Sequence, residues 1–316
     1  MGLIAPPDAP ERRGRAGMRV RAPAKARPRP PRPPRIPLPT LAFVVVWALA
    51  SLSGLAVWFL VYAFTLSGLQ EASSQHSLYA ALRTELAQGI APLGGSIPVG
   101  QPVAVLRVPQ AGINDVVVEG TTSSALEQGP GLLPGTGLPG QPGVSVILGR
   151  QSMFGGPFRH LPTLAGGDLI QVITGQGTFT YRVLDLRYPG DPLPSPLPAG
   201  QSRMIMVTIV GSGWLGGGKD RLLYVDAALV GKPVAAPSGQ PVVVSASQLP
   251  MHGDDDSGVF IVLVLRLQLL LLVGLAVGWA GPRWGKWPTW LVGAPAILAA
   301  VWGVSETAIA LFPNLL

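Results

Sequence analysis

The segment LIQVITGQGTFTYRVLDL (residues 169–186) gives a strong indication of the fold class. Its first six residues form a short apolar run, and its last nine alternate, which places Phe179, Tyr181, Val183 and Asp185 on one face. The GQG between the two runs is typical of a turn. The segment therefore predicts two β-strands joined by a tight connection.

The same pattern extends over residues 99–230, where short runs rich in β-branched residues are separated by Gly, Pro and Asp. Short strands at such regular spacing, with turn residues between them, are typical of an all-β barrel or sandwich. We expect about seven to eight strands in this region. Besides the two strands above, the runs are VAVLRV (103–108), NDVVVEG (114–120), VSVILG (144–149), MIMVTIV (204–210) and RLLYVDAALV (221–230).

Three further stretches are apolar enough to cross a membrane. Residues 41–66 carry no charge over 26 positions, and residues 259–280 and 290–312 form two more apolar runs. A helix of about 20 apolar residues spans the hydrocarbon core of a bilayer. Charged residues make up only 12% of the chain, against roughly 25% in soluble domains. The sequence therefore predicts three transmembrane helices.

The remaining segments connect these parts. Residues 1–40 contain eleven prolines and ten Lys or Arg, so we expect a disordered basic tail. Residues 67–98 begin with a helical pattern and are expected to form a stalk. Residues 231–257 form a Pro-, Ser- and Gly-rich linker, and residues 281–289 form a turn between the last two spans.

The distribution of positive charge predicts the orientation in the membrane. Residues 1–40 have a net charge of +8, from ten Lys or Arg and two acidic residues. The rest of the chain has a net charge of −1, from thirteen Lys or Arg and fourteen acidic residues. Cations concentrate on the cytoplasmic side of membrane proteins. We therefore expect a multi-pass cell-membrane protein with a cytoplasmic N-terminus, an extracytoplasmic β-domain and a cytoplasmic 281–289 turn. Because the basic charge lies in a tail, no nucleic-acid partner is expected.

The chain contains no cysteine and only three histidines. The absence of cysteine excludes disulfides, thiolate metal sites, Fe–S clusters and a cysteine nucleophile within this sequence. Three scattered histidines argue against a histidine-rich metal centre. We therefore expect neither a metal nor a cofactor.

The β-region resembles the sortases, the cysteine transpeptidases that join surface proteins to the cell wall or to each other in Gram-positive bacteria. The resemblance covers roughly 130 residues and is greatest to the class D and E type of actinobacteria. It implies a sortase-type β-barrel. The stretches that carry it are LRVPQAGINDVVVEG (106–120), GPGLLPGTGLPGQPGVSVILGR (129–150), FGGPFRHLPTLAGGDLIQVITGQGTFTYRV (154–183), MIMVTIVGS (204–212) and DRLLYVDAAL (220–229).

The resemblance implies a catalytic His, Cys and Arg at defined positions, and two of the three are replaced. Arg150 stands at the position of the His and Ile209 at the position of the Cys, whereas the Arg is retained as Arg221. Acyl transfer of this type needs a thiolate nucleophile and a group that can cycle a proton. Ile209 has no lone pair, and Arg150 stays protonated near neutral pH.

These replacements indicate a pseudoenzyme, a non-catalytic binding or assembly factor for cell-surface proteins or for a sortase partner. The two guanidinium groups would favour an anionic ligand in the former groove, unless Asp168 or Asp220 neutralises them. One alternative is an active hydrolase or transpeptidase that uses Thr208 or Ser212 as nucleophile. Another is a structural membrane-assembly subunit in which the barrel is only a spacer.

Arg266 and Glu306 are the only charges within the three expected spans. Arg266 lies seven residues past Val259 and Glu306 lies six before Phe312, so both fall roughly 10 Å below the outer membrane edge at about 1.5 Å per residue. Opposite charges at one depth on neighbouring helices predict an intramembrane ion pair.

Overall fold

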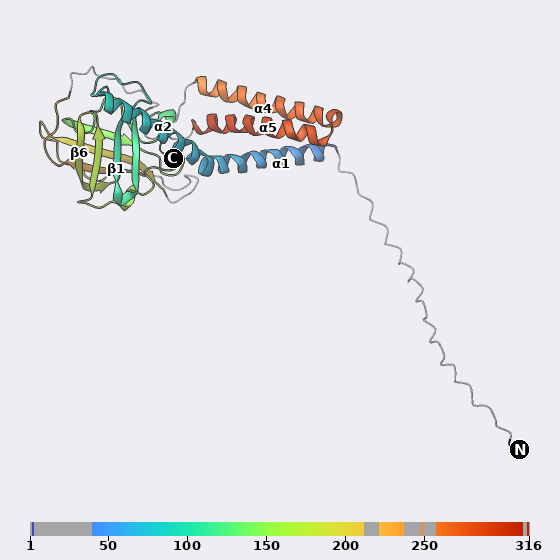
Figure 1. Ribbon diagram of the computed structural model, residues 1–316, viewed down its shortest axis with the longest axis horizontal. Coiled ribbons are helices and arrows are strands. Elements are labelled where there is room, and N and C mark those ends of the chain that lie inside the picture. The colour runs from blue at the N-terminus through green and yellow to red at the C-terminus, as the bar shows by residue number, and fades with distance from the viewer. Residues whose placement is uncertain are drawn as a thin grey trace. The chain divides into compact units, whose positions relative to one another are not determined.

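The computed structural model describes residues 2, 40–211, 221–236, 248, 257–311 and 315. Within them, eight strands close into a barrel in the order β1-β2-β3-β4-β7-β8-β6-β5, and β5 pairs with β1 (Figure 1). The all-β barrel prediction is therefore confirmed. The strands are β1 (Pro102–Val108), β2 (Ile113–Glu119), β3 (Gly131–Leu132), β4 (Gly143–Leu148), β5 (Leu169–Thr174), β6 (Gly177–Arg187), β7 (Ser202–Val210) and β8 (Arg221–Leu229).

The segment at 169–186 forms the antiparallel pair β5–β6. Phe179, Tyr181 and Val183 are buried in the barrel core, as their alternation predicts. Asp185 is exposed, because the β6–β8 pairing shifts between Val183 and Asp185. Such a bulge interrupts the alternation of faces and keeps this carboxylate out of the core.

β3 is the strand that periodicity did not reveal, since two residues are too short to show an alternating pattern. It runs parallel to β2 and antiparallel to β4, so it links these two strands in the barrel wall. A Cβ atom on Gly131 would lie 2.2 Å from the Gly120 carbonyl oxygen, so this close approach requires glycine. Just before β3, the short helix α3 (Ser123–Leu126) begins at Thr122, whose hydroxyl accepts a hydrogen bond from the Ala125 amide.

The first apolar stretch and the stalk form one helical run. It comprises α1 (Thr40–Val61), the π-helical turn η1 (Tyr62–Leu66) and α2 (Ser67–Gln88), and it ends at Gly89, whose φ is 68°. Leu78 and Leu82 of α2 pack against Val105 and neighbouring residues of β1 and β2. The stalk helix therefore lies on the barrel (Figure 1).

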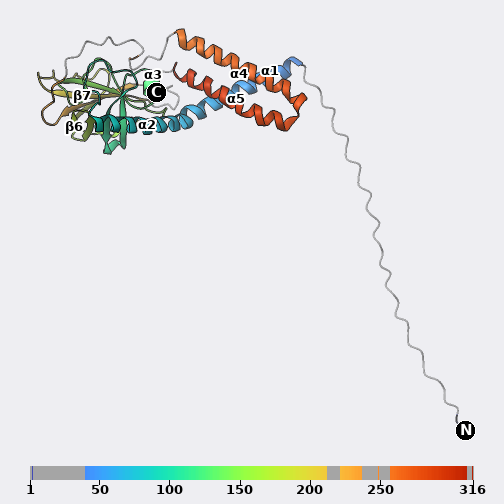
Figure 2. The ribbon, with the colours of Figure 1, turned by 45° about the horizontal axis from the view of Figure 1, so that its top comes forward.

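The C-terminal apolar stretches form α4 (Ser257–Trp284) and α5 (Lys286–Ile309), which lie side by side (Figure 2). Helix extends over most of the expected 281–289 turn, and Gly285, with φ 88°, makes the break between the two helices. A Cβ on Gly293 would lie 2.9 Å from the Val277 side chain, so the helices approach closely there. Helical segments at 48–88, 258–284 and 286–309 are long and apolar enough to cross a membrane.

Candidate functional site

The three positions implied by the resemblance come from neighbouring strands. β4 runs parallel to β7, and β7 pairs antiparallel with β8. The Gly149 amide donates to the Val207 carbonyl at 3.1 Å, and the Thr208 hydroxyl donates to the Gly149 carbonyl at 2.9 Å. These bonds hold the start of the loop after β4, and with it Arg150, against the end of β7.

Arg150 is fully buried. Its Nη2 atom donates to the Ser123 hydroxyl at 2.8 Å and to the Ser123 carbonyl at 3.2 Å, and its guanidinium carbon lies 4.8 Å from the centre of the Phe154 ring. Nε and Nη1 have no hydrogen-bond partner among the described residues. Burial lowers the pKa of Arg150 to about 10, and the Glu127 carboxylate opposes that shift.

Ile209 is 1% exposed and belongs to an apolar cluster on the outer side of the barrel. Val207 lies on the same face two residues earlier, whereas Met206 points into the barrel core. The remaining buried members of the cluster are Leu126, Leu148 and Leu315. The position implied for a nucleophile is therefore occupied by an apolar side chain in an apolar environment.

Arg221 lies on the opposite face from Ile209. In the β7–β8 ladder Ile209 is opposite Leu222, and Val210 is opposite Arg221. Facing residues share a side of the sheet and successive residues alternate. The Arg221 guanidinium lies over the Tyr188 ring, 4.6 Å from its centre. Arg150 is thus buried, whereas Arg221 is exposed over Tyr188. That the two guanidinium groups share one groove stays a prediction.

The residues weighed as substitute nucleophiles or neutralising acids lie as follows. Thr208 is fully buried, and its hydroxyl bonds to the Gly149 carbonyl. Asp168 uses its carboxylate to accept from the Ala165 amide at 2.8 Å, so it stabilises a turn. Ser212 and Asp220 lie outside the described residues.

The turn at Met153–Gly156 is a feature that periodicity gave no reason to single out. Phe154 is fully buried with a φ of 49°, a conformation that costs a non-glycine residue roughly 1–2 kcal/mol. Its amide donates to the Ser67 hydroxyl at 3.1 Å, and its ring packs with Tyr62, Ala63 and Ile309. The ring thus lies between Arg150 on the barrel and the helical segments.

A separate polar cavity of about 220 Å³ lies between α2, β2 and the loop after β4. Glu71, Asp115, Arg159 and His160 line it. Burial raises the pKa of Asp115 to about 6. Among the residues that the structure describes, no three His, Asp or Glu side chains are placed to hold a metal ion.

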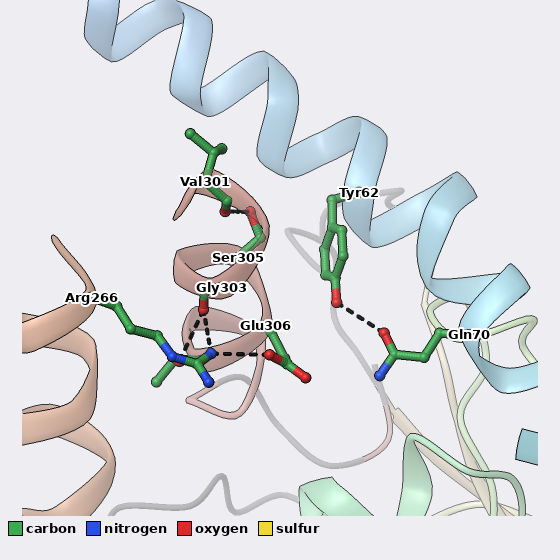
Figure 3. Close-up of polar contacts among 8 residues, drawn as sticks. Tyr62, Gln70, Arg266, Val301, Gly303, Ser305 and Glu306 are labelled. Atoms are coloured by element: carbon green, nitrogen blue, oxygen red, sulfur yellow. Dashed lines mark hydrogen bonds and ion pairs between the residues drawn. The ribbon is translucent and has the colours of Figure 1, made fainter. Parts of the chain in front are cut away.

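Arg266 and Glu306 face each other between α4 and α5 (Figure 3). Arg266 Nη1 lies 3.1 Å from Glu306 Oε2, and the same nitrogen donates to the Gly303 carbonyl. Both side chains remain more than one third exposed within this chain. Nearby, the Tyr62 hydroxyl donates to Gln70 at 3.1 Å (Figure 3).

The family model that describes the sortase domain matches residues 106–208. Among solved structures, the chain is similar to a sortase D5 transpeptidase from Clostridium perfringens, with 24% identity and a TM-score of 0.41 over 51% of this chain and 98% of that chain. It is similar to sortase E from Streptomyces avermitilis, with 27% identity and a TM-score of 0.36 over 44% and 94% of the respective chains. A search of curated proteins found no match. Residues 106–208 therefore carry a sortase-like domain, in a chain with three helices that could span a membrane.

Proposed function

We propose that this protein is a membrane-anchored, catalytically degenerate relative of class D and E sortases that acts as a binding or assembly factor. Its partners would be cell-surface proteins, or a sortase with its substrate. One observation carries the proposal: in a chain without cysteine, an isoleucine buried among leucines occupies the position implied for the nucleophile.

The chemistry at Arg150 supports a non-catalytic role. Even with a pKa lowered to about 10, only about one guanidinium in a thousand is neutral at pH 7. A group that transfers a proton during turnover needs a pKa near the working pH. Arg150 is also fully buried, which separates it from a water molecule or a leaving amine.

A substitute nucleophile at Thr208 receives no support from the geometry. A hydroxyl attacks a carbonyl only when a neighbouring base accepts its proton. The Thr208 hydroxyl instead donates a hydrogen bond to the Gly149 carbonyl oxygen inside the protein. Activation would require this buried hydrogen bond to break.

We further propose that the N-terminus and the short turn at Gly285 face the cytoplasm and that the barrel is extracytoplasmic. The ten cations of residues 1–40 support this orientation, as do Arg283 and Lys286 beside the turn. In this arrangement residues 41–66, 259–280 and 290–312 are membrane spans, residues 67–98 are a stalk and residues 231–257 are a linker.

A comparison in the native host tests the proposal. Cells carrying the intact chain, a chain without residues 100–230, or the Thr208→Val variant are scored for the surface proteins that they display. The assembly role predicts that only the deletion alters display. An unchanged display in the deletion strain supports the spacer alternative and overturns the proposal.

A second measurement addresses catalysis directly. The purified full chain in lipid nanodiscs is incubated with a peptide that carries a sorting signal, and cleaved and transferred products are quantified by mass spectrometry. We expect no product above the protein-free control. Turnover that the isosteric Thr208→Val change abolishes would establish an enzyme instead.

A further inference from the structure

The apolar cluster around Ile209 includes a residue from the far end of the chain. Leu315 is fully buried and packs in one cluster with Leu148, Val207 and Ile209. Its carbonyl oxygen accepts a hydrogen bond from the Gln151 amide at 3.2 Å. A side-chain contact and a main-chain contact therefore place Leu315 beside two of the three positions that the resemblance identifies.

A second contact lies six residues earlier, where α5 ends. Ile309 is fully buried and packs with Met153 and Phe154 of the turn that follows Arg150. The Phe154 ring in turn lies over the Arg150 guanidinium. Leu315 thus contacts Leu148 and Gln151, which flank Arg150, and Ile309 contacts the turn that follows them.

The Met153–Gly156 turn is held in a strained conformation where it meets the helices. Phe154 has a positive φ although it is not glycine, and the Ser67 hydroxyl accepts its amide hydrogen. Strained residues persist only where the surrounding packing holds them, and they gather at functional contacts. Here the packing comes from Tyr62, Ala63 and Ile309.

We propose that the surface around Ile209 is an intramolecular docking site for the end of the α4–α5 hairpin, that Leu315 closes it to other peptides, and that Ile309 holds the hairpin end on the adjoining turn at Met153 and Phe154. The proposal goes beyond the assembly role, because it assigns an occupant to the degenerate site. A peptide that binds on β4 and β7 must first displace Leu315.

Two physical arguments favour occupation from within the chain. A tethered segment is present at a high effective concentration, commonly in the millimolar range, so a free peptide must compete with it. The site also suits its occupant, since burial of a leucine among leucine, valine and isoleucine side chains shifts an equilibrium about tenfold or more.

Thiol labelling tests the proposal, because the native chain contributes no background thiol. Full-length Ile209→Cys is labelled with a maleimide in nanodiscs, alone and combined with Leu315→Ser. We expect labelling to become about tenfold faster in the double variant. Met206→Cys provides the matched control, since this buried residue lies on the same strand but points into the core, and its labelling should not change with Leu315→Ser.

The two outcomes that contradict the proposal are distinct. An Ile209→Cys rate that Leu315→Ser leaves unchanged shows that Leu315 does not cover the site. Equal acceleration at Met206→Cys shows general loosening of the barrel and also overturns the proposal.

A crosslinking experiment identifies which copy supplies the occupant. The Ile209→Cys/Leu315→Cys variant is treated with a short bis-maleimide and digested. A crosslink within one chain supports docking in cis, whereas a covalent dimer shows exchange between copies and overturns the intramolecular claim. Absence of both products overturns docking itself. None of these readouts depends on peptide turnover or surface display, so this proposal and the assembly role fail separately.

Discussion

Removal of either partner of the Arg266–Glu306 pair should destabilise the α4–α5 hairpin, and removal of both should cost less than the sum. Arg266 Nη1 contacts the Glu306 carboxylate at 3.1 Å and the Gly303 carbonyl as well. Arg266→Leu removes both contacts, whereas Glu306→Leu removes one. We therefore expect Arg266→Leu to lower the free energy of unfolding more than Glu306→Leu does.

The size of the coupling follows from the exposure of the pair. The two side chains are 36% and 39% exposed within the chain, so the pair is not sealed in a dry interior. Polar contacts between membrane helices contribute about 0.6 kcal/mol on average and about 1.7 kcal/mol at most. We expect a coupling free energy of roughly 0.5–1.5 kcal/mol, with the sign that marks attraction.

The assay is a double-mutant cycle on the full chain. Unfolding is followed in mixed lipid–detergent micelles for the wild type, Arg266→Leu, Glu306→Leu and the double variant. Gln268→Leu combined with Glu306→Leu is the matched control, because Gln268 is an exposed polar residue on the same helix. The control pair should be additive. Additivity of the Arg266 and Glu306 changes within about 0.3 kcal/mol would show that the two side chains are not coupled.

Three further predictions concern the barrel and the orientation of the chain. Burial raises the pKa of Glu119 to about 7, so the folded state keeps a proton that the unfolded state releases above about pH 4.5. The free energy of unfolding should therefore fall by up to about 3 kcal/mol as the pH rises from 5 to 8. Glu119→Gln should reduce this pH dependence in denaturant titrations, and an unchanged dependence would contradict the assignment. Gly140→Ala should lower the free energy of unfolding by roughly 2 kcal/mol or more, because φ is 97° and the new Cβ would lie 2.3 Å from the Phe179 ring. Thermal unfolding measures this loss, and Gly143→Ala is the control, because its φ is similar but its Cβ would meet open space, so it reports the backbone cost alone. Finally, cysteines introduced at position 20 or 285 should resist an impermeant thiol reagent in intact cells, and labelling at either position would show that the proposed orientation is wrong.

The fold class could be predicted from local patterns because each strand carries its own signal. Alternation in TFTYRVLDL placed Phe179, Tyr181 and Val183 in the core, and long apolar stretches identified the membrane-spanning candidates. The two-residue strand β3 gave no such signal, since it depends on glycine at position 131 and on pairing with β2 and β4. The bulge that exposes Asp185 likewise arises from pairing with β8.

The absence of cysteine, and the presence of Ile209 and Arg150 where the resemblance places the nucleophile and the acid, can be read from the order of residues alone. The surroundings of these residues depend on the packing of the folded chain. The β7–β8 register puts Arg221 on the other face from Ile209, because neighbouring side chains in a strand alternate between the two faces of a sheet. The contact of Phe154 with Arg150 and the packing of Leu315 in one cluster with Ile209 join segments far apart in the chain. Local sequence patterns do not predict such contacts, because packing between distant segments depends on the path of the whole chain.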